Sequence, residues 1–250
     1  LSDAESCIAE QFALWGDVVD FDSAFELYRE ALALPPSSLM SRAALLNILA
    51  DTIMQRVAQQ GDPSDLDSTI NLYHESLSLR PADDLARAPA LQNLGHALYR
   101  RFGHRGNYKD LESAIKRYYE ALAFWSDVSH IHRGTCLNNL AIEFQLRSSL
   151  TGNLEDLSRA ITLHEEALSL RPPPHSERGR SLSNLGTAAL GKRGDVADLE
   201  AVVHCHRKSL EQVPAPHPNC GAVFQGFAVA LIDHCPGATP LANPTLLLRR

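Results

Sequence analysis

The residues of this sequence that could do metal chemistry are cysteines and histidines near its C-terminal end. Structural zinc sites use closely spaced pairs of ligands. An example is two cysteines separated by two other residues, together with two histidines separated by three to five. Neither spacing occurs here, and we expect no metal site and no cofactor. The residues concerned are His204, Cys205, His206, Cys220, His234 and Cys235.

A cysteine nucleophile is the second chemistry to consider. Such a site needs a base and an oxyanion donor beside the thiolate, brought together by a compact fold. The cysteines are odd in number and widely scattered, which also argues against a disulfide framework. We therefore expect a chain that is not an enzyme and that resides in the reducing cytoplasm. The five cysteines are Cys7, Cys136, Cys205, Cys220 and Cys235.

Composition and charge narrow the class of protein. The chain has 250 residues, of which 44% are hydrophobic and 21% charged, which is ordinary for a packed soluble domain. Its net charge is −7, whereas a general nucleic-acid binder needs a basic surface for the phosphates. No apolar run approaches the ~18 residues of a membrane span. We expect no nucleic-acid or membrane partner.

A short string recurs five times along the chain. Each copy has a glycine, then Asp or Asn, and a second Asp three residues further on. Glycine in a left-handed conformation ends a helix, the next residue caps the following helix, and the second acid can reach back to that cap, as in a capping box. Each string therefore predicts a helix end and a helix start. The second aspartates are Asp20, Asp65, Asp110, Asp156 and Asp198.

The strings divide the chain into pairs of helices. Apolar residues step by three and four on both sides of each string, which is typical of helices that bury one face. No segment alternates with the period of two that a strand requires. The first helices are predicted over 38–60, 84–105, 129–150, 175–193 and 218–234, and the second helices over 17–34, 62–80, 107–125, 153–171 and 195–213.

These helix pairs resemble the tetratricopeptide repeat. Leu94-Gly95 and Leu185-Gly186 match the Leu-Gly pair of that family's first helix. The second helices match its small residue, its aromatic residue four positions later and its final proline, as in Ala160, His164, Ala167 and Pro172. The period is 42–46 residues rather than 34, and the first helix lacks the family's tryptophan. Long units of this kind are similar to kinesin-light-chain-like arrays and to fungal arrays found beside CHAT-type protease domains.

The resemblance implies the fold class and the domain organisation. It predicts an all-α, right-handed superhelical solenoid of antiparallel helix pairs over residues 1–235, with about five units and an incomplete first one. Residues 236–250 are then a C-terminal tail or linker. Residues 220–235 should form an exposed apolar patch that contacts a downstream domain or a second copy, because nothing polar enough to cap the array follows them.

Polar residues inside the first helices are the candidate peptide-binding residues. Asn is unfavourable in mid-helix because its side chain competes for backbone hydrogen bonds, so its recurrence needs a reason. The resemblance implies that first helices line a concave groove, where an amide can donate to and accept from a peptide backbone. Alternatively, the amides bond to one another between adjacent first helices and only fix their stacking. The candidates are Asn93, Asn139, Asn184, Asn47, Gln92, Asn138, His96, Arg100 and Arg180.

Arginine also recurs at one place, eight residues before the small residue of each first helix. The two interpretations are a structural ion pair or cap between neighbouring units and a ligand clamp. The clamp is disfavoured because the position shares a helix face with buried leucines. The residues are Arg42, Arg87, Arg133 and Arg178.

Charge separates the two helix sets, since the first helices are net positive and the second net negative. A basic groove would favour an acidic or C-terminal peptide through electrostatic steering. The sequence thus predicts a protein–protein interaction scaffold that binds an extended peptide segment in its groove. The alternative is a regulatory or sensor array of a larger enzyme, such as a CHAT-type, caspase-like protease, whose groove binds another domain of the same chain.

Overall fold

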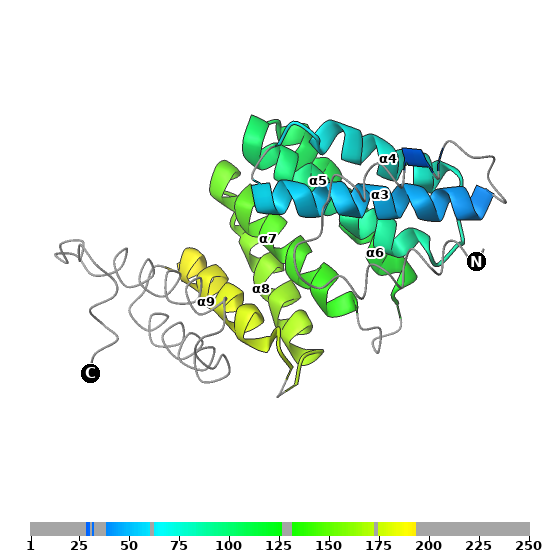
Figure 1. Ribbon diagram of the computed structural model, residues 1–250. Coiled ribbons are helices and arrows are strands. Elements are labelled where there is room, and N and C mark those ends of the chain that lie inside the picture. The colour runs from blue at the N-terminus through cyan, green and yellow to red at the C-terminus, as the bar shows by residue number, and fades with distance from the viewer. Residues whose placement is uncertain are drawn as a thin grey trace, which may run out of the picture. The chain divides into compact units, whose positions relative to one another are not determined.

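The computed structural model describes residues 29–30, 32, 39–60, 63–126, 132–172 and 175–193. Within these residues the chain forms seven helices and no strand (Figure 1). None of these helices combines the length and the apolar character needed to cross a bilayer. The helices are α3 (Leu39–Gln60), α4 (Leu66–Ser78), α5 (Arg87–Arg105), α6 (Tyr108–Phe124), α7 (Arg133–Thr151), α8 (Leu154–Ser169) and α9 (Arg178–Arg193).

The helices form two compact units, which divide between Phe124 and Trp125. In the N-terminal unit, α3 packs against α4, α4 against α5, and α5 against α6. In the C-terminal unit, α7 packs against α8, and α8 against α9 (Figure 1). The first helices of successive repeats also touch, α3 with α5 and α7 with α9. The predicted all-α class and the repeated helix pairs are therefore confirmed.

Glycine ends the first helices as the repeated string predicts. Gly106 and Gly152 have φ angles of 67° and 72°, in the left-handed region, and each backbone N–H donates to the last turn of the helix before it. Asn153 then caps α8 by accepting from the backbone N–H of Glu155 at 2.9 Å. Because only two residues separate each of these helices from the next, the pairs are antiparallel.

The role predicted for the second acid of the string needs correction. Asp110 and Asp156 stand in the first turns of α6 and α8, but both carboxylate oxygens of each accept from an arginine nine residues upstream, Arg101 or Arg147, at 2.7–2.8 Å. A guanidinium offers two parallel N–H donors to a carboxylate, whereas the helix cap offers a single N–H. The acid therefore ties the two helices of one repeat together.

The predicted helix starts are three or four residues early for most helices. The chain makes turns before α4, α5 and α9, as the hydrogen bond from Leu66 N to Pro63 O shows for α4. The first string, the predicted helix pair over 195–234 and the proposed tail at 236–250 lie outside the described residues. The domain boundaries stay a prediction.

The residues that pack inside each repeat recur at the same positions from one repeat to the next. The second helices place Tyr73, Tyr118 and His164 at one buried position, each at most 1% exposed. Gly95 gives Tyr118 room, because a Cβ atom on Gly95 would lie 3.1 Å from the Tyr118 ring. A side chain on Gly95 would therefore require the Tyr118 ring to shift.

Two glycines near the end of α5 should respond oppositely to alanine. Gly103 lies in the helix with open space around its Cα, so Gly103→Ala should raise the free energy of unfolding by about 0.5–1 kcal/mol. Gly106 has open space too, but its left-handed φ opposes a side chain, and Gly106→Ala should lower that free energy by about 1–2 kcal/mol. Urea denaturation of the two variants measures both effects, and equal signs would contradict the assignment of Gly106 as the helix stop.

Candidate functional site

Six of the predicted binding residues, Asn93, Asn139, Asn184, His96, Arg100 and Arg180, share one side of their first helices by helical spacing, and we call this side the amide face. It is defined by Asn93 on α5, Asn139 on α7 and Asn184 on α9, with the residues three, four and seven positions from them along each helix. Each unit carries its own part of this face. The amide face is largely half-buried, so its side chains are both packed and reachable from solvent.

In the N-terminal unit, Asn93 bonds to an acid that sequence reasoning missed. Its Nδ2 donates to Oδ1 of Asp51 on α3 at 2.8 Å, and the Tyr73 hydroxyl donates to the same oxygen. Burial raises the pKa of Asp51, and these two hydrogen bonds partly oppose the rise. The available signal was position, since Asp51 occupies in α3 the place that His96 occupies in α5.

Two other amides of this unit are incompletely bonded. Asn47 and Gln92 stand at equivalent positions of α3 and α5, and both are half-buried. Their side-chain oxygens are shielded from water and accept no hydrogen bond within the described part of the chain. Buried acceptors of this kind normally have a donor, so these two amides are exceptions among the described residues.

Arg100 supplies positive charge on this part of the amide face, and His96 lies one turn before it on α5. His96 is exposed, yet the surrounding protein and the charge of Arg100 lower its pKa. Arg100 is half-buried and makes no ion pair with any residue that the structure describes. The charge of Arg100 is therefore unpaired within the part of the chain that the structure describes.

In the C-terminal unit, the amides differ in their hydrogen bonding. Asn184 Nδ2 on α9 donates to Oδ1 of the buried Asn138 on α7 at 3.1 Å, which is the stacking bond expected between adjacent first helices. Asn139, beside Asn138, is half-buried and bonds to no residue among those described. The stacking interpretation therefore holds for one pair, and Asn139 remains available.

An open apolar pocket of about 570 Å³ adjoins this part of the amide face. It lies between the C-terminal half of α7, the start of α8 and the middle of α9. Ile142 and Thr187 are each three residues from an amide of the face, Asn139 and Asn184, and both line the pocket together with Leu146, Leu154 and Leu157. An apolar side chain placed here would lie beside the available amide.

The four arginines that recur near the starts of the first helices are structural. Each donates to carbonyl oxygens at the end of the preceding second helix, which lack partners inside that helix. Arg42 and Arg133 also pair with an acid 33 residues later, Glu75 and Glu166. The cap interpretation is thus confirmed over the clamp. The bonds run from Arg42 to Leu32 O, from Arg87 to Leu77 O and Arg80 O, from Arg133 to Trp125 O, and from Arg178 to Leu168 O and Arg171 O.

A second recurring ion pair accounts for much of the charge separation between the helix sets. Arg56, Arg101 and Arg147 on the first helices pair with the string's aspartates at the starts of the second helices. Part of the positive charge of the first helices is thus neutralised inside its own repeat. On the amide face, Arg100 and Arg180 remain, and among the described residues Arg180 pairs with the nearby Glu177.

Two observations on the described residues concern the metal and thiol chemistry considered above. They hold no group of three or more His, Cys, Asp or Glu residues arranged to bind a metal. Cys136 is buried, and burial raises the pKa of its thiol to about 12, which disfavours the reactive thiolate. The Cys/His cluster at 204–235 lies outside the described residues.

Comparisons with known proteins identify the fold of the chain. No family model and no curated protein matches the chain. Solved structures do match: BtubC (BKLC) from P. vanneervenii has a TM-score of 0.61 and 19% identity over 94% of this chain and 84% of that chain. The MamA protein has a TM-score of 0.54 and 20% identity over 82% of this chain and 87% of that one.

A third solved structure has repeats named for the family that the sequence resembles. It is a Podosopora anserina putative kinesin light chain with nearly identical TPR-like repeats, matched with a TM-score of 0.54 and 18% identity over 76% of this chain and 88% of that chain. At these identities the likeness shows the fold. The tetratricopeptide-like array predicted from the sequence is therefore confirmed.

Proposed function

We propose that this chain is a protein–protein interaction scaffold that binds an extended peptide segment along the amide face of its first helices. Its role is binding rather than catalysis, in keeping with the buried thiol of Cys136 and the absence of a metal-binding cluster among the described residues. The tetratricopeptide-like fold supports a scaffold role by analogy only, because one fold serves many functions.

The observation that carries the proposal is the pairing of Asn139 with the pocket next to it. Asn139 bonds to no residue that the structure describes, and Ile142, one turn further along α7, lines the open apolar pocket. An extended peptide presents backbone N–H and C=O groups with side chains on alternate sides, so it can bond the amide while one side chain fills the pocket. Arg180 of the same unit would favour a peptide that also carries acidic groups.

Replacing Asn139 by Ala tests the proposal. Peptides are first selected from a random library on the intact chain, and their affinities are then measured by calorimetry. Asn139→Ala should weaken binding by about 0.5–1.5 kcal/mol, since one amide-to-backbone hydrogen bond is lost, and should leave Tm unchanged.

Asn184→Ala is the matched control, because Asn184 uses its amide to bond Asn138. This variant should lower Tm, and it should weaken peptide binding less than Asn139→Ala does. If Asn139→Ala binds every selected peptide as tightly as the wild type, the amide face is not the binding surface.

A further inference from the structure

Glu143, near the middle of α7, is a buried acid without a partner. The residue is 2% exposed, and its Oε2 atom is shielded from water. The carboxyl makes no hydrogen bond or ion pair with any residue that the structure describes. Buried carboxyl groups are normally bonded, because removing a charge from water is costly. Without a partner, the group avoids that cost by keeping its proton.

The other first helices show that this position belongs to the packed core. It lies two residues after the small residue of the first helix, and it is buried in all four first helices that the structure describes. Alanine stands there in α5 and α9, and in α3 the hydroxyl of Thr52 donates to the carbonyl of Ile48 in its own helix. Among these four helices, α7 alone places an ionisable group at the position. The equivalent residues are Thr52, Ala97, Glu143 and Ala188.

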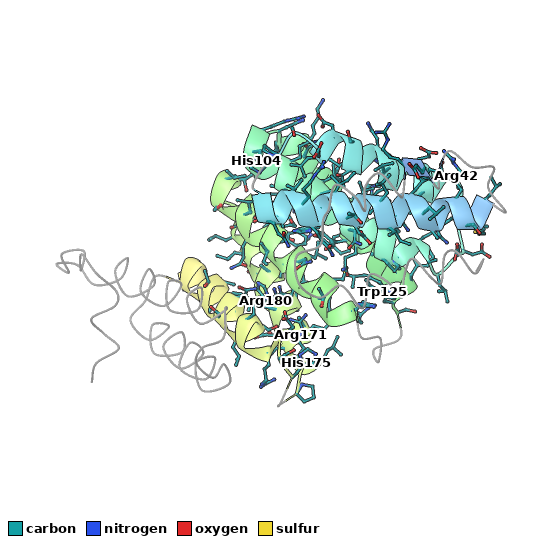
Figure 2. The ribbon with its side chains drawn as sticks, viewed as in Figure 1. Arg42, His104, Trp125, Arg171, His175 and Arg180 are labelled. Carbon is teal, nitrogen blue, oxygen red and sulfur yellow. The ribbon has the colours of Figure 1, made fainter. Side chains whose placement is uncertain are left out.

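The charged groups of α7, and of the helices α8 and α9 that pack against it, have other partners. Arg171, which follows α8, and Arg180 on α9 lie near the start of α9 (Figure 2), and Arg171 donates to two hydroxyl groups there. Arg178 donates to carbonyl oxygens, and Glu165 is exposed. The ion pairs are Arg133 with Glu166, Arg147 with Asp156, Arg159 with Glu155 and Arg180 with Glu177.

Burial therefore sets the protonation of Glu143. It raises the pKa of the carboxyl to about 9, so the group carries a proton at neutral pH. The buried histidine of the same repeat offers no positive charge, because burial and the charge of Arg171 lower the pKa of His164 to about 4. The thiol of Cys136 on α7 is neutral as well. In the unfolded chain Glu143 returns to its ordinary pKa of 4.5 and is ionised at neutral pH.

We propose that Glu143 makes the repeat formed by α7 and α8 a pH-sensitive element of the array, which opens more readily as the pH rises through the neutral range. The carboxyl keeps its proton while the repeat is folded and releases it when opening exposes the group to water. Opening thus releases one proton, so each unit of pH between 4.5 and about 9 favours the open state by up to about tenfold. An acid held in an ion pair behaves in the opposite way, since it stabilises the folded state as the pH rises. This response does not depend on the proposed peptide binding.

Hydrogen exchange of the intact chain at about pH 6 and pH 8 tests this element. The reference is Glu143→Gln, which keeps the shape of the side chain but cannot ionise, so the intrinsic pH dependence of exchange cancels. Where the repeat recloses faster than its amides exchange, the ratio of the wild-type rate to the variant rate follows the opening equilibrium. In α7 and α8 this ratio should rise about a hundredfold between the two pH values, as the release of one proton requires. In α3 and α4 the ratio should stay constant.

Two further variants separate ionisation from packing. Glu165→Gln removes an exposed acid from α8, and the ratio of wild-type to variant rates should be the same at both pH values. Glu143→Ala introduces the residue that α5 and α9 have at this position. Its cavity changes the ratio at both pH values, but the rise of the ratio with pH should match that of Glu143→Gln.

A titration followed by NMR measures the protonation of Glu143 directly. In a chain with isotope-labelled glutamate carboxyls, the resonance that disappears in Glu143→Gln belongs to Glu143, and it should titrate with a midpoint of about 9. A midpoint near the ordinary value of 4.5 would overturn the proposal, as would a rate ratio that is equal at the two pH values. A rise of the ratio spread evenly from α3 to α9 would overturn the assignment to one repeat.

Discussion

Replacing Arg147 by Met should lower the free energy of unfolding by about 3–5 kcal/mol, because it leaves a buried carboxylate without its partner. Arg147 Nε and Nη2 each donate to one oxygen of Asp156 at 2.7 Å, and Asp156 is 3% exposed. Methionine keeps most of the apolar stem of Arg147, whose guanidinium also lies over the Phe144 ring at 4.9 Å. The loss should therefore come chiefly from the stranded charge. Urea denaturation at neutral pH measures it.

The ion pair between Arg159 and Glu155 supplies the control in the same unit. Both of its side chains are more than half exposed, so Arg159→Met should change the free energy of unfolding by no more than about 1 kcal/mol. The double variant Arg147→Met/Asp156→Leu should recover most of the loss, because it removes both charges together. If the double variant were as unstable as Arg147→Met, the buried charge would not be the cause.

This ion pair shows where sequence reasoning succeeded and where it stopped. The repeated string correctly marked helix ends, because glycine and Asn act through the backbone of their immediate neighbours, as Gly152 and Asn153 do. The second aspartate was assigned to the same local cap. Its partner, nine residues upstream, becomes adjacent only when the two helices fold back against each other. A regular Arg–Asp spacing of nine was the signal that was missed.

Predictions about the amides depended on geometry beyond one repeat. The sequence showed that Asn recurs in mid-helix, but a partner 42 or 46 residues away depends on the rotation of one first helix relative to the next. Asn184 therefore meets Asn138, whereas Asn93 meets Asp51. The position of an amide in the repeat did not reveal which amides are used for stacking.

The arginine pattern was predicted more successfully because its physical basis is local to a helix end. The last carbonyls of a second helix need donors, and an arginine at the start of the following helix can supply them. Arg171 shows the limit of this reasoning. Arg80 pairs with Asp84 four residues further on, whereas the chain has His175 four residues after Arg171. Only the comparison of two folded repeats reveals that difference.

The second large effect concerns the core of the C-terminal unit. Leu140 is completely buried in α7, and Leu140→Ala should lower the free energy of unfolding by about 2–5 kcal/mol through lost burial and the cavity left behind. Leu150 is on the same helix but 55% exposed, so Leu150→Ala should have an effect within about 0.5 kcal/mol. Chemical denaturation of the two variants compares the same change of side chain at a buried and an exposed site.

The location of the lost stability along the array is the stronger test, because it shows how the repeats stabilise one another. Each helix pair buries its apolar face against its neighbours in the chain, as α8 does against both α7 and α9. Stability in such an array is a sum of repeat and nearest-neighbour terms, so a cavity at Leu140 should loosen nearby repeats more than distant ones. Hydrogen exchange of Leu140→Ala should therefore show lost protection centred on residues 110–170, with α3 and α4 less affected. Uniform loss from α3 to α9 would mean that the repeats unfold as one cooperative core, and binding at the amide face would then stabilise the whole array rather than the repeats it touches.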